Sequence, residues 1–126
     1  MQFFNIGDDS GDIEVQFSMR LFEFLNRFGD INAIDHNYNM TSRFRFNPMS
    51  DHMILIGPEL KEFISKEAGG YLAQRVRQSL VNACRTFNDQ MNALENQHKP
   101  NINPANTIVS WYMSQTDATL MKLRFG

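Results

Sequence analysis

The chain has 126 residues, 42% of them apolar and 21% charged, which is the balance of a single globular domain spanning 1–126. Its net charge of −2 argues against broad phosphate-driven binding and leaves room only for a local basic patch. The sequence has no apolar run of about 18 residues, so we expect no membrane span. The first twelve residues lack the basic and apolar regions of a signal peptide. A single cysteine, Cys84, excludes an internal disulfide and fits a reducing cytoplasm.

The N-terminal region predicts a β-hairpin followed by a helix. Residues 1–6 (MQFFNI) are typical of a short strand, and GDDSGD (7–12) has the composition of a turn. Apolar and polar side chains then alternate, which predicts a strand over 13–17 that pairs with the first across the turn. A helix over 19–28 would follow, with Ser18 as its N-cap.

A single helix over 13–28 is the alternative, because the apolar residues there also fit one helical face. The element order would then be βαββαβ plus one strand, which resembles a ferredoxin-like layout. Residues 30–39 have little periodicity and predict a loop. Two further strands are expected, one over 40–47, where Phe and Arg alternate, and one over 52–57 (HMILIG).

The dominant helical signal runs from residue 58 to residue 97. Its first half and its second half carry apolar faces that would point in opposite directions on one continuous helix. A break at Gly69-Gly70 removes this conflict and predicts two helices, about 58–68 and about 71–97. One continuous helix, in which the glycines allow close packing, is the alternative.

The C-terminal region predicts a second hairpin. Residues 107–114 (TIVSWYMS) and 119–126 (TLMKLRFG) both alternate, and QTDA between them has the composition of a tight turn. The fold class we expect is therefore α+β. A small, mostly antiparallel sheet of about four to six strands, including this C-terminal hairpin, would be covered by one long helix (about 71–97) and one or two short helices.

Candidate catalytic and metal-binding residues are few and poorly spaced. Three aspartates in the first turn lack the ligand order of a calcium loop, and three histidines show no helical pairing. Cys84 falls in the apolar stripe of the long helix, where a packed thiol is expected. We therefore expect no catalytic site, no metal and no cofactor, with an enzyme whose site is assembled from His36, His52 and an aspartate as the third and weakest alternative. The residues considered are Asp8, Asp9, Asp12, His36, His52 and His98.

Two surfaces are candidates for binding. Phe44 and Phe46 interleave with Arg43 and Arg45, an arrangement that single-strand nucleic-acid binders use for base stacking; core-facing phenylalanines are the alternative explanation.

The other candidate is a protein interface, formed by aromatic and arginine residues near the C-terminus and by the outer face of the long helix, where amides outnumber charges. Its predicted residues are Trp111, Tyr112, Arg124, Phe125, Asn82 and Arg85, and the remaining polar positions on that helix face are Gln74, Arg75, Gln78, Asn88, Asp89 and Asn92.

These features predict a non-enzymatic protein that works by protein–protein interaction or assembly. Phe and Met are abundant, a bias common in AT-rich genomes such as those of many viruses of bacteria. A subunit of a viral particle, or an inhibitor of a host protein, is the expected role, in the host cytoplasm or in the virion. The partner would be a second copy of the chain (a homo-oligomer) or another viral or host protein. A nucleic-acid-binding domain built on residues 43–46 is the alternative.

Overall fold

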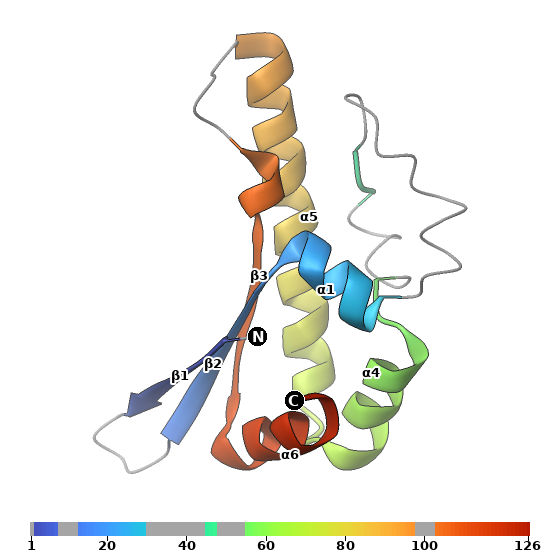
Figure 1. The fold of residues 1–126 in the computed structure, drawn as a ribbon, viewed down its shortest axis with the longest axis vertical. Coiled ribbons are helices and arrows are strands. Elements are labelled where there is room, and N and C mark those ends of the chain that lie inside the picture. Colours follow the sequence, from blue (N-terminus) through green and yellow to red (C-terminus); the bar gives the residue numbers. More distant parts are fainter. Residues whose placement is uncertain (1, 8–12, 30–44, 48–54, 98–102) are drawn as a thin grey trace.

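The computed structural model describes residues 2–7, 13–29, 45–47, 55–97 and 103–126. The elements in chain order are β1 (Gln2–Gly7), β2 (Ile13–Arg20), α1 (Leu21–Phe28), α4 (Pro58–Glu62), the π-helical turn η1 (Phe63–Glu67), α5 (Leu72–Gln97), the 3₁₀ turn η2 (Pro104–Asn106), β3 (Ile108–Ser114) and α6 (Gln115–Phe125). Figure 1 shows the long helix α5 beside a small sheet, with the shorter helices packed around the lower half of both.

The sheet is antiparallel, and its strand order is β1-β2-β3. The predicted N-terminal hairpin is confirmed, since Phe3 pairs with Phe17 and Gly7 with Ile13. The strand-then-helix interpretation of 13–28 is also confirmed, and the single helix is excluded. The prediction of Ser18 as N-cap was wrong, because the strand continues to Arg20 and α1 begins only at Leu21.

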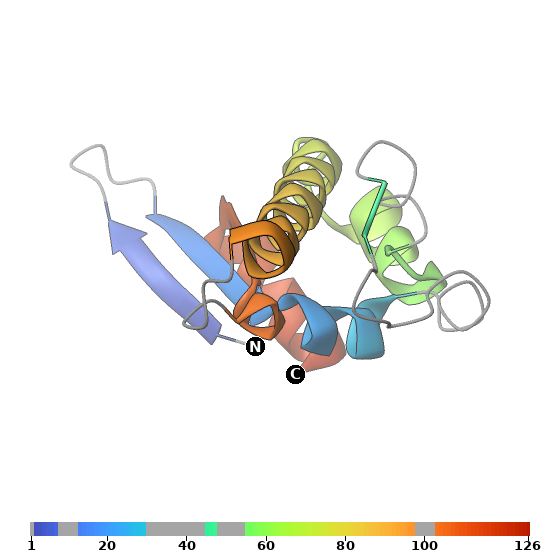
Figure 2. The same ribbon diagram turned by 90° about the horizontal axis from the view of Figure 1, so that it is seen from above.

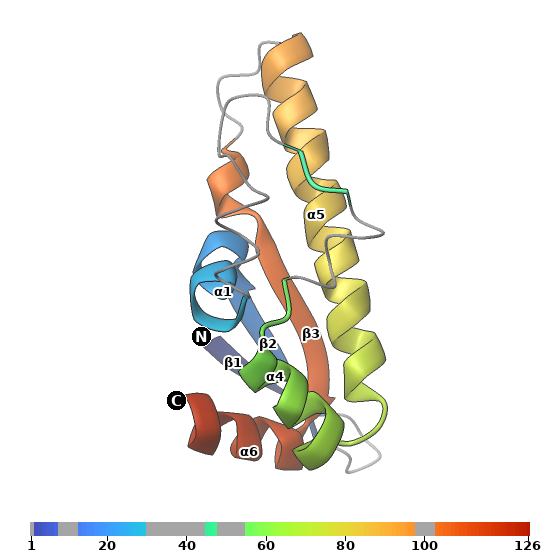
Figure 3. The same cartoon turned by 90° about the vertical axis from the view of Figure 1, so that its right-hand side faces the viewer.

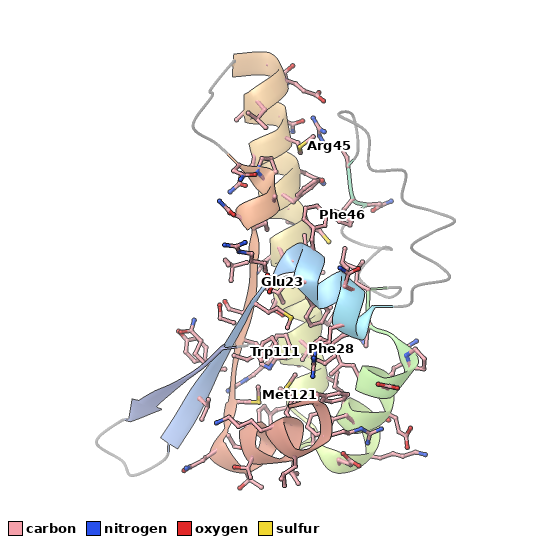
Figure 4. All side chains as sticks on the ribbon, viewed as in Figure 1. Glu23, Phe28, Arg45, Phe46, Trp111 and Met121 are labelled. Carbon is pink, nitrogen blue, oxygen red and sulfur yellow. The ribbon has the colours of Figure 1, made fainter. Side chains whose placement is uncertain are left out.

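One face of the sheet carries the apolar core. Side chains at alternate positions of β2 and β3 are buried there, and α1 and α6 pack against them (Figure 3). The rings of Phe17 and Trp111 stack with centroids 4.2 Å apart, at the centre of this layer. Figure 4 shows Trp111, Phe28 and Met121 gathered on the same side of the sheet. The buried strand residues are Val15, Phe17, Met19, Val109, Trp111 and Met113.

The long helix α5 runs along β3 and contributes the other wall of the core. The buried positions that follow the predicted stripe are Leu72, Val76, Leu80, Ala83, Cys84 and Phe87, and Ser79 and Val81 beside them are buried too. The predicted break is confirmed, because the first helical segment ends at Glu67 and Ala68 is extended. Gly69 donates its backbone N–H to the Asp117 carboxylate at 3.2 Å, which ties the break to the start of α6.

The predicted C-terminal hairpin was wrong, because residues 115–125 form the helix α6. The Ser114 hydroxyl accepts the backbone N–H of Asp117 at 3.1 Å and caps the helix. Ala118 and Met121 are buried and Phe125 is partly buried, at a spacing of three and four residues that fits one helical face. The alternation along the segment was therefore a misleading signal over too short a stretch.

The described residues hold three strands, fewer than the four to six expected. Of the predicted strand over 40–47, residues 45–47 have no regular structure and the rest lies outside the described residues. The predicted strand over 52–57 is not found either, since residues 55 and 56 form a bend, residue 57 has no regular structure and 52–54 lie outside the described residues. The coarser expectation is confirmed: the fold is α+β, with an antiparallel sheet and one long helix.

Candidate functional site

A shallow groove of about 360 Å³ lies between α5 and the outer face of the sheet. The outer face is the side opposite the core, where Ile108 and Tyr112 of β3 are 49% and 42% exposed. The groove brings together residues of β2, β3 and α5 that lie up to about 100 positions apart in the chain. Its lining residues are Glu14, Arg75, Gln78, Ser79, Asn82, Ser110, Trp111 and Tyr112.

Arg75 closes one end of the groove and covers the edge of β3. Its Nη1 donates to the backbone carbonyl of Tyr112 at 2.8 Å and to Glu14 Oε1 at 3.0 Å. The guanidinium also lies 4.8 Å above the ring of Tyr71. One turn before it, the Tyr71 hydroxyl accepts the backbone N–H of Ser114 at 2.8 Å. The side chains of Arg75 and Tyr71 thus bind backbone groups at the edge of β3 that could otherwise pair with a further strand.

Apart from Glu14 and Arg75, the residues that line the groove are uncharged, and they combine amides and hydroxyls with aromatic surface. Glu14 and Arg75 form an ion pair with each other, so their charges largely compensate. Gln78 and Asn82 are joined by a hydrogen bond of 3.0 Å along α5, and both are exposed. The Ser79 hydroxyl is buried and donates to the Val76 carbonyl at 2.7 Å, so its proton is held within the helix. The free-energy cost of removing water from amides and hydroxyls is smaller than the cost of removing it from charged groups, so a partner can cover this groove more easily.

The structure brings Tyr112 and Asn82 together in this groove, although they were predicted as interface residues on different grounds. Trp111 requires a correction, because it is only 3% exposed and belongs to the core rather than to a surface. Its ring stacks on Phe17 and meets Phe24 edge-on, and no described group accepts a hydrogen bond from its indole N–H. Arg85 is exposed on α5 but does not line the groove.

Arg124 and Phe125 lie at the end of α6, and neither lines the groove. The guanidinium of Arg124 pairs with Glu67 at 2.7 Å and with Glu62 at 3.5 Å. The Glu67 hydrogen bond raises the pKa of Arg124 above its ordinary value, so the group stays charged. Phe125 packs edge-on against Phe28 and Phe63. Both residues therefore fasten α6 to the fold and have intramolecular partners.

Arg45 and Phe46, the described part of the predicted nucleic-acid segment, also have intramolecular partners. Phe46 is 4% exposed and packs edge-on against Phe87, so it is not placed to stack on a base. Arg45 donates to Asn92 at 3.0 Å and forms an ion pair with Glu95 at 2.9 Å. Arg43 and Phe44 lie outside the described residues.

The candidate metal ligands are mostly outside the described residues too. All three histidines and the aspartates of the first turn fall there. Within the described ranges, no group of three or more His, Cys, Asp or Glu residues could hold a metal ion. Cys84 is buried in the core stripe, as expected for a packed thiol.

Glu14, Ser79 and Ser110 are groove residues that sequence reasoning missed as site residues. The alternation of β3 did place Ser110 and Tyr112 on one face, which was the available signal. The contact between Glu14 and Arg75 joins residues 61 positions apart, and it depends on β3 lying between β2 and α5. No local pattern contains that information.

Comparison with known proteins does not identify the chain: no family model, no curated protein and no solved structure matches it. Among the helices that the structure describes, none combines the length and the apolar character needed to cross a membrane.

Proposed function

We propose that this is a non-enzymatic protein that works by protein–protein interaction or assembly, with the groove between α5 and β3 as a contact surface. The observation that carries the proposal is that exposed Tyr112 and the amides of Gln78 and Asn82 line one groove. The two charged residues of that groove, Glu14 and Arg75, form an ion pair with each other. Tyrosine is enriched at interface hot spots, and interface centres are depleted of uncompensated charge.

The biological setting that we propose is a virus of bacteria, in which the protein is a particle subunit or an inhibitor of a host protein. It would act in the host cytoplasm or in the virion, with a second copy of itself or another viral or host protein as partner. The support is compositional, namely 11 Phe and 8 Met among 126 residues. Nucleic-acid binding through residues 43–46 has less support, since Phe46 is in the core and Arg45 pairs with Glu95.

The first experiment measures native mass by size-exclusion chromatography with light scattering, together with the 260/280 nm absorbance ratio. The proposal expects a defined multiple of 14.6 kDa with a protein-like ratio. A high 260 nm ratio that collapses in salt would contradict it and favour nucleic-acid binding. A clean monomer restricts the proposal to partners other than the chain itself.

A second experiment tests the groove directly in cells that express the protein. A photo-crosslinking residue replaces Tyr112 in one variant and Arg77 in a control, which is also exposed but lies about 140° around α5 from Asn82. We expect crosslinked protein products at position 112 and few at position 77. Absence of products at both positions, in a folded protein, would contradict the proposed contact surface.

A further inference from the structure

The sheet has two edges, and the structure treats them differently. The β3 edge is covered by the start of α5, where Arg75 of the helix and Tyr71 directly before it bind the β3 backbone at Tyr112 and Ser114. At the other edge, β1 pairs with β2 alone, and no described strand lies beyond it. Figures 1 and 2 show the β1–β2 hairpin extending away from the helices.

The hydrogen bonds at the β3 edge fix which backbone groups of β1 point outward. The carbonyl of Tyr112 and the N–H of Ser114 face α5, so the alternate residues Trp111 and Met113 face β2. The same alternation across an unbroken register directs Gln16 of β2 towards its partner Phe4 in β1.

Three residues of β1 consequently point their N–H and C=O groups away from the sheet: Phe3, Asn5 and Gly7. These residues alternate with those whose N–H and C=O groups point towards β2, so their own groups form a regular row along the outer edge. The sequence of β1, QFFNIG, contains neither a charged residue nor a proline, the two devices that most often prevent an edge strand from pairing. This edge is therefore suited to another strand.

We propose that the occupant of this edge is β1 of a second copy, paired antiparallel about a twofold axis that passes midway between the Asn5 residues of the two copies. In that register Asn5 lies opposite Asn5 of the second copy, and Phe3 lies opposite its Gly7. All three outward residues are used on both copies, which makes the contact self-complementary and closed. The inference rests on the proposed assembly function and supplies its partner.

The pairing has a consequence for the groove. Two three-stranded sheets would join into one sheet of six strands, with the order β3-β2-β1-β1-β2-β3. A twofold axis perpendicular to the sheet keeps the helices of both copies on one side. The two grooves then lie at opposite ends of the same outer face, so the dimer presents its contact surface twice.

The test compares Asn5→Pro with Asn5→Ala by light scattering at one concentration. Proline removes the outward N–H, and edge positions with an outward N–H are where strands tolerate it. Alanine removes only the side chain. We expect twice 14.6 kDa for the wild-type protein and for Asn5→Ala, and 14.6 kDa for Asn5→Pro with an unchanged circular dichroism spectrum. A wild-type monomer, or an Asn5→Pro dimer, would overturn the proposal.

Amide exchange of the wild-type protein covers the case in which Asn5→Pro fails to fold. We expect the N–H groups of Phe3, Asn5 and Gly7 to be protected at high concentration and to lose protection on dilution. Exchange that is fast at every concentration would overturn the edge pairing. The proposed function would still stand if position 112 gave crosslinked products, so the two failures are distinguishable.

Discussion

Asn88 binds both backbone polar groups of Phe46 through its side-chain amide. Its Oδ1 accepts the Phe46 N–H at 2.9 Å, and its Nδ2 donates to the Phe46 carbonyl at 2.7 Å. The segment 45–47 has no regular structure, so the Asn88 side chain provides the donor and the acceptor that a neighbouring strand would provide in a sheet. The ring of Phe46 is thereby held against Phe87 in the core.

Asn88→Ala is expected to destabilise the fold by about 2 kcal/mol, because the partly buried N–H and C=O groups of Phe46 would both lose their hydrogen bonds to the Asn88 amide. Asn88→Asp keeps the acceptor and loses the donor, so we expect an intermediate loss. Urea unfolding followed by circular dichroism measures both. Asn82→Ala is the matched control, since its amide is exposed and hydrogen-bonds the exposed side chain of Gln78 on the same helix. Equal midpoints for Asn88→Ala and Asn82→Ala would show that the Phe46 contact does not contribute.

Trp111 and Tyr112 are neighbours with opposite roles, and alanine substitution should separate them. Trp111→Ala is expected to cost about 3–5 kcal/mol, because the stacked ring leaves a cavity beside Phe17. Tyr112→Ala is expected to stay within about 0.5 kcal/mol, as is usual for exposed positions. Thermal unfolding measures both free energies. A near-neutral Trp111→Ala would contradict the core assignment and return Trp111 to the candidate interface.

Local patterns predicted most of what depends on one element at a time. Alternating apolar and polar residues predicted β2 and β3, and the apolar stripe predicted α5. The opposite directions of the apolar faces before and after Gly69-Gly70 predicted the helix break, and all of these are confirmed. The error at α6 was also local: Ser114 and Asp117 form a capping signal three residues apart, which the alternation that follows them obscured.

The site depended on tertiary placement, which the sequence shows much less clearly. Tyr112 was predicted from its residue type and Asn82 from its helix face, and nothing in the chain said that the two faces meet. The burial of Trp111 next to exposed Tyr112 follows from which face of β3 receives α1 and α6. That choice is made by packing among elements far apart in the chain.

Tyr71→Phe tests the junction between the helix break and α6. The Tyr71 hydroxyl donates to Asp117 Oδ2 at 2.7 Å and accepts the Ser114 N–H at 2.8 Å. Its removal is expected to cost about 1–2 kcal/mol, since one of the two bonds is to a carboxylate. Tyr112→Phe is the control, because Tyr112 is 42% exposed and little change is expected there. Equal melting temperatures for the two variants would show that the junction does not depend on this hydroxyl.

Two glycines offer the final test, because an added Cβ would meet close backbone atoms at one and open space at the other. A Cβ on Gly57 would meet the backbone carbonyls of Phe28 and Gly29, neither of which can move without shifting the end of α1. Gly57 also donates its N–H to the Phe28 carbonyl, so the segment before α4 and the end of α1 are already in close contact. A Cβ on Gly70 would meet nothing within 4 Å.

Gly57→Ala is therefore expected to destabilise by about 1–3 kcal/mol through overpacking. Gly70→Ala should be neutral or stabilise by up to about 1 kcal/mol, because alanine restricts the unfolded chain more than glycine does. Denaturant unfolding of both variants gives the comparison. If Gly70→Ala were the more damaging substitution, the break before α5 would depend on glycine at position 70. If both were neutral, the close approach of residue 57 to α1 would be relieved at no cost.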